Sequence, residues 1–289
     1  MKIKILVPVY NDWQSVAKLI SEIDDLAKNI NHEISIIVVN DASNHDRDET
    51  VKEYNNLKSV KILNMKINQG HARCIATGLK YINEKEDFDY IIPMDGDGED
   101  RPEEILQFIE NINTSNNKPI VGERVKRSES LLFQICYKIH KLITLVFTGH
   151  TIKFGNFTCL PKDTVEKMTK EKATWNSFSG ALKKIEKDLI KVPSVRGSRY
   201  FGPSKMSFKN LITHSLSIIS VFRKTVLFRS ALFIVFYILL IKSNASIITL
   251  IPFVLLLIMI YSISSLSLRE NIDEYNNSLK NIEDIIALK

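Results

Sequence analysis

Residues 90–100 read Tyr90-Ile91-Ile92-Pro93-Met94-Asp95-Gly96-Asp97-Gly98-Glu99-Asp100, a short apolar run followed by carboxylates and glycines. Carboxylates this close together repel one another, so the cluster needs a compensating charge. A divalent cation would supply that charge, and hard oxygen ligands suit Mg²⁺ or Mn²⁺. An Asp-Gly pair on its own is more often a solvated acidic turn. The rest of the chain has to decide between these two interpretations.

The sequence around this cluster alternates between apolar strands and amphipathic helices. Strands are predicted at residues 2–9, 34–39, 60–65, 89–94 and 120–122, with helical periodicity in most of the intervening segments. This alternation predicts a Rossmann-like α/β fold, in which helices cover both faces of a mostly parallel sheet. Three of the strands end in polar loops that contain Asp, and such loops meet at the ligand-binding edge of α/β sheets.

Two long apolar runs follow the α/β region. The chain has 289 residues and a formal net charge of +6, yet residues 247–268 contain no charged side chain. That length suffices to span a bilayer. Residues 226–241 form the other apolar run, and only a short turn separates the two. The two runs therefore predict a two-helix transmembrane hairpin. The alternative is a buried helix pair in a soluble core. Arg229, one turn inside the first run, is expected to reach toward phosphate headgroups.

We therefore divide the chain into four parts. They are an α/β body at 1–210, a juxtamembrane or interfacial helix at 211–225, the two transmembrane helices at 226–268, and a cytoplasmic helix at 269–289. The helical spacing of the last part also leaves a homo-oligomer contact open. A further helix at 128–147 is apolar almost all round, so we expect it to pack under the body or to graze the membrane.

Flanking charge predicts the orientation of the hairpin. Basic residues before and after it outnumber the single Lys242 in the turn, and they are Lys205, Lys209, Arg223, Lys224, Arg229 and Arg269. Positive flanks favour the cytoplasm, so we expect a multi-pass protein of the inner membrane with a cytoplasmic body. The start of the chain does not read as a signal peptide, and three cysteines without metal-ligand spacing fit a reducing compartment. Basic residues interleaved with acidic ones argue against nucleic acid as a partner.

An ordered set of short motifs covers roughly residues 3–210. They read Pro8-Val9-Tyr10-Asn11, Val39-Asn40-Asp41-Ala42-Ser43, Asn68-Gln69-Gly70 leading to Gly78, Asp95-Gly96-Asp97-Gly98-Glu99-Asp100-Arg101-Pro102-Glu103-Glu104, Gly122-Glu123-Arg124 with Arg127, and Arg199-Tyr200-Phe201-Gly202-Pro203-Ser204-Lys205-Met206-Ser207. In this order, and followed by a hairpin, the motifs resemble the family 2 glycosyltransferases of GT-A fold. Within that family the chain looks most similar to the membrane-anchored polyprenyl-phosphate glycosyltransferases, the dolichyl-phosphate mannose synthase-like group.

The resemblance implies a site for a nucleotide sugar. Its donor-binding residues would be Pro8, Tyr10, Asp12, Asp41, Asn68, Gly70, Asp95 and Arg124. Asp41 would accept hydrogen bonds from base or ribose, although its local sequence fits a helix cap equally well. The resemblance also implies that Asp97, with Asp95 and Glu99, holds Mg²⁺ or Mn²⁺, which neutralises charge on the departing diphosphate.

Basic residues would complete the site. Together with Asp95 and Asp97, the resemblance assigns catalysis to Arg124, Arg199 and Lys205. It assigns the lipid phosphate to a partly overlapping set, namely Arg127, Arg199, Ser204 and Lys205. Solvated surface arginines are the alternative for Arg127 and Arg199. Two departures from the pattern stand out, because Asn156 lies where the subgroup often has Asp, and Asn40 replaces the first Asp of the usual pair.

A phosphate acceptor fits this sequence better than an alcohol. An alcohol needs a general base, whereas a phosphate monoester is already anionic near neutral pH. No convincing base stands in the motifs, since His71 reads as a helix-start residue. We therefore predict an inverting, metal-dependent transfer of one sugar from a UDP- or GDP-linked donor to a polyprenyl phosphate. The alternatives are transfer to a hydroxyl of a lipid-linked oligosaccharide or surface glycan, and a catalytically silent membrane subunit. A nucleotidyltransferase would need a Gly-rich phosphate loop that the first strand lacks.

Overall fold

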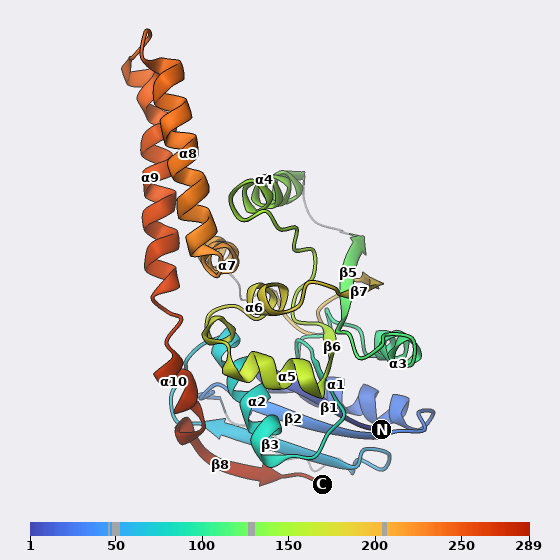
Figure 1. The fold of residues 1–289 in the computed structure, drawn as a ribbon. Coiled ribbons are helices and arrows are strands. Elements are labelled where there is room, and N and C mark those ends of the chain that lie inside the picture. The colour runs from blue at the N-terminus through green and yellow to red at the C-terminus, as the bar shows by residue number, and fades with distance from the viewer. Residues whose placement is uncertain (46, 48–52, 127–130, 204–206) are drawn as a thin grey trace.

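A mixed sheet forms the centre of the body in the computed structural model, which describes residues 1–45, 47, 53–126, 131–203 and 207–289 (Figure 1). Within the described residues the sheet has eight strands in the order β7-β5-β6-β4-β1-β2-β3-β8. Their bounds are β1 Lys2–Val9, β2 Glu33–Asn40, β3 Ser59–Met65, β4 Tyr90–Pro93, β5 Ile120–Lys126, β6 Thr158–Pro161, β7 Ile190–Val195 and β8 Ile282–Ala287.

The predicted α/β architecture is confirmed. β1 pairs in parallel with β2 and β4, β2 with β3, and β5 with β7. β6 runs antiparallel between β4 and β5, and β8 runs antiparallel along β3. From Ile34 to Asn40, β2 is buried without interruption, which is the pattern of a parallel strand covered on both faces.

Helices cover both faces of the sheet, and each face has its own apolar core. The first core contains α1 Trp13–Ala27 and α3 Ile105–Ile112, which follows the short 3₁₀ turn η1 Pro102–Glu104. The second core contains α2 His71–Lys85, α5 Lys162–Lys170 and α6 Phe178–Ile185, with η2 Lys172–Trp175 between the last two. The periodic apolar residues of each helix supply the buried stripe, as amphipathic spacing requires.

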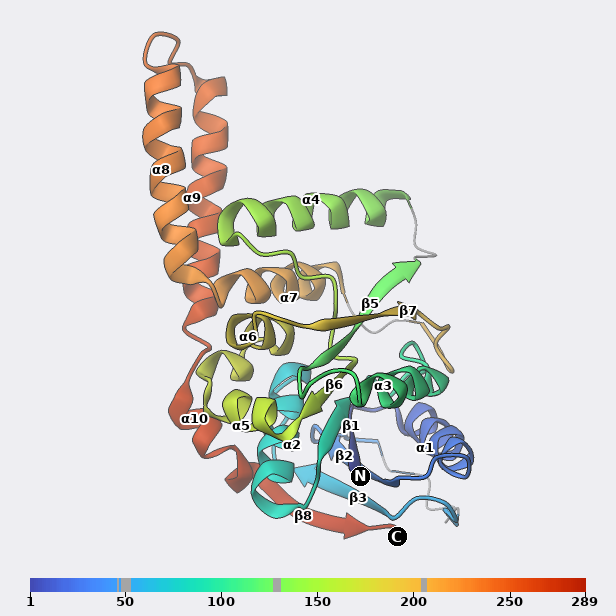
Figure 2. The ribbon, with the colours of Figure 1, turned by 45° about the vertical axis from the view of Figure 1, so that its right-hand side comes forward.

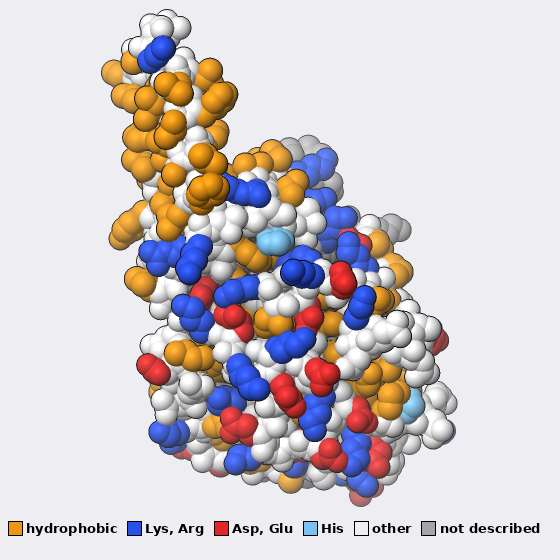
Figure 3. Space-filling view, viewed as in Figure 1, with side chains coloured by type: hydrophobic (Ala, Val, Ile, Leu, Met, Phe, Trp, Pro, Cys, Tyr) orange, Lys and Arg blue, Asp and Glu red, His pale blue; other side chains and the backbone are white. Residues whose placement is uncertain are grey.

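Two long apolar helices rise from the body as a hairpin (Figure 1). They are α8 Arg223–Ile241 and α9 Ile247–Ser267, and both are long and apolar enough to cross a membrane. The Ser246 hydroxyl caps α9 in a reciprocal box with Thr249, which starts the second helix directly after the turn. The outer surface of the hairpin is almost entirely hydrophobic, whereas charges of both signs cover the body (Figure 3). A lipid environment explains this contrast.

Two further helices connect the body to the hairpin. α7 Phe208–Ser220 packs Ile219 and Leu216 against the second core, and α4 Leu131–Thr148 lies beside the base of the hairpin (Figure 2). On α4, Leu142 and Val146 remain exposed at 61% and 49%. The guanidinium of Arg229 donates to the Val146 carbonyl at 2.8 Å and so ties α8 to the end of α4. The contact of Arg229 with lipid headgroups stays a prediction.

The prediction of a helix at residues 269–289 is wrong. Only α10 Ile272–Asn276 and the 3₁₀ turn η3 Ser278–Asn281 are helical, and β8 then joins the sheet. The turn-forming Asn276-Asn277-Ser278 sequence interrupts the helical periodicity. The isoleucines beyond it are β-branched, and β3 offers them an edge with unpaired backbone groups. The chain therefore returns from the hairpin to complete the sheet of the body.

Candidate functional site

Polar loops from three parallel strands meet at one edge of the sheet, as the sequence predicts. Asp12 follows β1, Asp41 follows β2 and Asp95 follows β4, and these strands are neighbours in parallel register. We call the carboxylates at this edge the acidic edge, and they are Asp12, Asp95, Asp97, Glu99 and Asp100. The carboxyl ends of α/β strands are where such folds bind ligands, so this edge is the candidate site.

The loop after β4 is held in shape by its own carboxylates. The backbone amide of Asp95 donates to Asp100 at 2.9 Å, and that of Glu99 donates to Asp97 at 3.0 Å. Gly98 has a φ of 88°, and a Cβ there would lie 2.7 Å from the Tyr200 ring. Glycine is required at this position because both the backbone conformation and the aromatic neighbour exclude a side chain.

A second loop carries two arginines onto the acidic edge. Arg199 forms an ion pair with Asp97 and donates to Asp12 at 2.9 Å, while Arg196 pairs with Glu99. Backbone bonds from Gly197 to the Glu99 carbonyl and from Tyr200 to the Asp97 carbonyl, both 2.9 Å, fix the loop in place. Arginine provides the compensating charge for these carboxylates in this structure.

His71 faces the carboxylate at the end of β4. Its Nε2 lies 3.3 Å from Asp95 Oδ1 and 2.8 Å from Asn156 Nδ2, and Asn156 itself lies 3.4 Å from Asp95. The sequence prediction treated His71 only as a helix-start residue, and it does start α2. The structure adds a contact that crosses from α2 to the loop before β6. Asn156, in the position where the subgroup often has Asp, thus contacts a carboxylate and an imidazole.

The carboxylates of the edge titrate very differently. Burial and the nearby Asp95 raise the pKa of Asp97 to about 6 and that of Asp100 to about 7. Burial opposes ionisation of Asp95 as well, but His71 and Arg124 outweigh it and hold the pKa of Asp95 well below its ordinary value. For His71, desolvation is outweighed by Asp95, so its pKa is raised. Negative charge at this edge therefore exceeds what the protein's own cations neutralise.

Arg124 extends from β5 toward the same edge. Its guanidinium lies against Gly155, where a Cβ would meet it at 3.4 Å. Its charge helps to lower the pKa of Asp95 and offsets part of the rise in the pKa of Asp100. The sequence prediction that Arg124 faces the site agrees with this placement. A planar guanidinium next to a ligand-binding edge can hold a phosphate with two parallel hydrogen bonds.

Asp41 has a structural role in this site. It is buried, and its two carboxylate oxygens accept hydrogen bonds from the Gln69 and Gly70 amides, both at 2.8 Å. Gly70, with a φ of 93°, then leads into α2. Asp41 thereby anchors the turn that places His71. Its contact with a nucleoside stays a prediction, as do the donor-binding roles of buried Pro8, exposed Tyr10 and exposed Asn68.

The donor chemistry of the acidic edge fits a divalent cation. Carboxylate oxygens are the preferred ligands of Mg²⁺ and Mn²⁺, and raised pKa values mark a surplus of negative charge. Within the described part of the chain, no three His, Cys, Asp or Glu side chains lie close enough to hold an ion by themselves. The predicted set of Asp95, Asp97 and Glu99 is not preassembled, because Arg196 and Arg199 turn Glu99 and Asp97 toward themselves.

Some predicted residues cannot be placed, and two others were missed. Arg127, Ser204 and Lys205 lie outside the described residues. His71 and Arg196 were not predicted as site residues. Arg196 had a weak signal, since it lies three residues before Arg199 in a basic, glycine-containing stretch. The contact of His71 with Asn156 has no local signal, because 85 residues separate the two.

Comparison with known proteins identifies the family. The model of the glycosyl transferase family 2 matches residues 4–174, more than half of the chain, and the chain belongs to this family. Two curated relatives are undecaprenyl-phosphate 4-deoxy-4-formamido-L-arabinose transferases. The one from Klebsiella pneumoniae strain 342 is 23% identical over 73% of this chain and 64% of its own length. The one from Photorhabdus laumondii is 27% identical over 73% of this chain and 65% of its own length. The match thus spans just under two thirds of each relative.

Solved structures with the same fold include two synthases. Glucosyl-3-phosphoglycerate synthase from Mycobacterium tuberculosis, in complex with Mn²⁺, UDP and glucosyl-3-phosphoglycerate, has a TM-score of 0.55 and 11% identity over 78% of this chain and 79% of its own. Mannosyl-3-phosphoglycerate synthase from Rubrobacter xylanophilus has a TM-score of 0.53 and 11% identity over 76% of this chain and 72% of its own. The fold of the body is therefore GT-A, as the sequence predicts.

Proposed function

We propose that this protein transfers one sugar from a nucleotide sugar to a polyprenyl phosphate at a membrane surface. One observation carries the proposal: an acidic strand-end edge with arginines and an apolar hairpin occur in one chain of glycosyl transferase family 2. The two curated relatives, named as undecaprenyl-phosphate sugar transferases, support the choice of acceptor. The hairpin supports it too, because a polyprenyl lipid cannot leave the bilayer and the enzyme has to go to it.

The donor diphosphate is assigned to the acidic edge. Asp97 and Asp95 would hold Mg²⁺ or Mn²⁺ together with diphosphate oxygens, and a bound cation would neutralise charge on the leaving group. Arg199 already lies between Asp12 and Asp97, so a cation at Asp97 would free its guanidinium for a phosphate oxygen. Arg124 approaches the same edge from β5 and is assigned to phosphate binding as well.

The acceptor needs no general base in this scheme. A polyprenyl phosphate oxygen is already ionised and attacks the anomeric carbon from the side opposite the diphosphate, so the configuration inverts. Asp95 lies against His71 and its pKa is held low, which makes it a poor proton acceptor, and Asp97 is assigned to the cation. Arg127, Ser204 and Lys205 remain our predicted ligands of the lipid phosphate.

We infer that α8 and α9 each cross the membrane once and that the body lies in the cytoplasm. Lys209, Arg223 and Lys224 precede the first crossing and Arg269 follows the second, against Lys242 in the turn. This distribution favours a cytoplasmic body. The nucleotide sugar would then reach the acidic edge from the cytosol.

The experiment uses membranes that contain the full chain, Mn²⁺ and undecaprenyl phosphate, with a panel of radiolabelled UDP- and GDP-sugars. We expect label from one donor to enter the organic phase as a product that mild acid releases, and EDTA to prevent this. Membranes with the Asp97→Asn variant serve as the control. Label that enters a water-soluble or lipid-linked glycan only when that glycan is added would overturn the phosphate acceptor in favour of a hydroxyl.

A further inference from the structure

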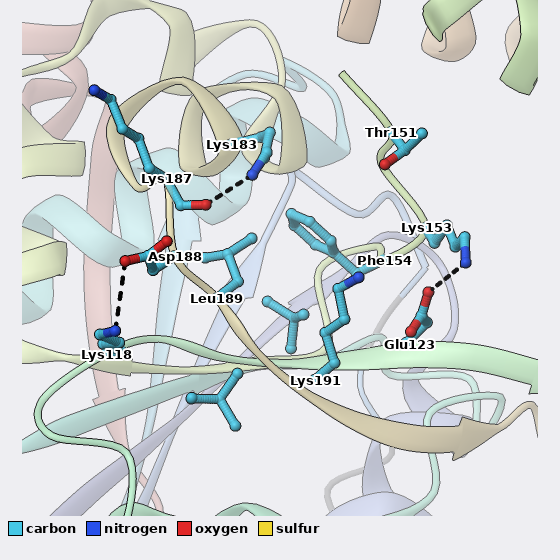
Figure 4. Close-up of a pocket in the computed structure, with 12 residues that line it drawn as sticks. Lys118, Glu123, Thr151, Lys153, Phe154, Lys183, Lys187, Asp188, Leu189 and Lys191 are labelled. Atoms are coloured by element: carbon cyan, nitrogen blue, oxygen red, sulfur yellow. Dashed lines mark hydrogen bonds and ion pairs between the residues drawn. The ribbon is translucent and has the colours of Figure 1, made fainter. Parts of the chain in front are cut away.

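A second charged region lies on the other face of β5. A cavity of about 480 Å³ is enclosed by β5, β7, the end of α6 and the loop after α4 (Figure 4). Five lysines and only two carboxylates line it, and we call it the lysine cavity; its charged residues are Lys118, Lys153, Lys183, Lys187, Lys191, Glu123 and Asp188. Its charge is opposite in sign to that of the acidic edge, so it is not an extension of the donor site.

The strand β5 separates these two regions by simple alternation. Val121 and Glu123 point to the lysine cavity, whereas Arg124 points to the acidic edge. Val121 also belongs to the core that contains α5, α6 and α7. The lysine cavity therefore lies on the face of the sheet that carries α4 and the hairpin (Figure 1). Successive side chains of a strand point to opposite faces, which makes the separation a direct result of the sequence.

The acids of the lysine cavity do not neutralise its lysines. Glu123 pairs with Lys153 at 2.9 Å, and Asp188 lies 3.5 Å from Lys118. Lys183 donates to the Lys187 carbonyl at 2.9 Å. Lys191 extends from β7 toward Phe154 (Figure 4) and has no ion-pair partner of its own within the described residues. Positive charge is thus left over around one hollow.

The pKa of Glu123 is consistent with this surplus of positive charge. The pKa of Glu123 is lowered, first by its hydrogen bond with Lys153 and then by the charges of Lys191 and of Lys141 on α4. Three lysines from three elements therefore act on one carboxylate. Apolar side chains form the rest of the wall, including Phe154 and Leu189. The lining combines cations with a non-polar surface, which suits a ligand that has an anionic head and a carbon skeleton.

We propose that the lysine cavity binds a phosphate-bearing ligand, separately from the donor site. Lysine ammonium groups bind phosphate as mobile point charges, and several of them around one hollow can share its oxygens. Two sources have this chemistry: the headgroup of an anionic phospholipid and a soluble phosphate ester. The position of the lysine cavity, on the face that carries α4 and the base of the hairpin, gives access to the first source, and its open side gives access to the second.

Binding is measured on the full chain without donor or acceptor, so the result does not depend on sugar transfer. In the lipid arm, native mass spectrometry counts phosphatidylglycerol and phosphatidylcholine bound to the detergent-solubilised protein. In the soluble arm, calorimetry follows glycerol phosphate. The test variant Lys118→Gln/Lys191→Gln removes two of the five lysine charges that line the lysine cavity. The control Lys28→Gln/Lys58→Gln makes the same charge change at exposed lysines next to α1 and β3.

We expect one of the two probes to bind the wild type and the control equally. Its affinity for the test variant should fall by at least about tenfold, because each charged hydrogen bond is worth roughly that factor. Phosphatidylglycerol bound in preference to phosphatidylcholine identifies the lipid source, and glycerol phosphate identifies the soluble one. Asp188→Asn should tighten binding several-fold, since it releases Lys118. No binding of either probe, equal loss in both double variants, or weaker binding by Asp188→Asn would overturn the proposal.

An unfolding scan separates a lost ligand from a lost fold. Lys118 has an exposed side chain and Lys191 is exposed on β7, so neither substitution removes buried contacts. The unfolding midpoint of the ligand-free test variant should equal that of the control. If the two midpoints differ, Asp188→Asn still tests whether the lysine cavity binds the ligand, because this substitution makes the cavity more positive and not less.

Discussion

The acidic edge and the lysine cavity lie on opposite faces of β5, and they handle surplus charge in opposite ways. At the acidic edge, arginines and a histidine reach across from other elements and pair with the carboxylates, as in the Arg199 bridge between Asp12 and Asp97. In the lysine cavity, the acids are too few and Lys191 has no ion-pair partner of its own within the described residues. A site whose charges are already paired must exchange partners when its ligand arrives. A site with unpaired charge can bind directly.

The largest expected effect comes from removing a carboxylate at the acidic edge. Asp97→Asn should lower sugar transfer by at least about a hundredfold, because a preorganised group opposite the developing charge is lost. The fold should survive, since an amide has nearly the same shape. The assay is transfer of labelled sugar into the organic phase, with Asp25→Asn on the exposed side of α1 as the matched control. Near-normal activity of Asp97→Asn would remove Asp97 from the metal site.

The pH dependence of metal use gives the next largest effect. The pKa of Asp97 is raised to about 6, and a cation binds only the ionised carboxylate, so protons compete with the metal below that pH. The Mn²⁺ concentration for half-maximal transfer should therefore rise roughly tenfold from pH 7 to pH 5, as expected for competition with one proton. It should change little between pH 7 and pH 8. Equal metal requirements at pH 5 and pH 7 would show that Asp97 does not hold the cation.

The strands that form the acidic edge could largely be predicted from the sequence. The β-branched runs and the polar residues after them fix the strands β1, β2 and β4, and parallel pairing then brings Asp12, Asp41 and Asp95 to one edge. The hairpin follows from uncharged length alone. These features depend on local patterns, which is why the sequence is sufficient for them.

Long-range contacts could not be predicted in the same way. The isoleucines after Asn277 have a spacing that suits a helix, and only the free edge of β3 makes them a strand. Arg196 pairs with Glu99 across 97 residues, and the lysine cavity gathers residues from β5, β7, α6 and a loop. Each of these depends on which elements become neighbours in space. A motif list treats Arg199 as a phosphate ligand, whereas the folded chain first uses it to pair two carboxylates.

The smallest expected effect concerns the one histidine of the acidic edge. Asp95 raises the pKa of His71, so the protonated imidazole stabilises the folded, metal-free protein. This contribution is complete below the ordinary histidine pKa and disappears as the pH rises through the raised value. The side chain of His71 is 48% exposed, so solvent screening limits the gain to about 0.5 kcal/mol or a degree or two of unfolding midpoint.

His71→Gln should therefore unfold slightly earlier than wild type at pH 6 and together with it at pH 9, both in EDTA. Tryptophan fluorescence during heating gives the midpoints. His32→Gln is the control, because His32 has no carboxylate partner within the described residues. A midpoint difference that grows with pH would mean that His71 stabilises the edge as a neutral ring held by Asn156. In that case arginine alone would compensate the carboxylates, and the contrast with the lysine cavity would rest on Arg124, Arg196 and Arg199.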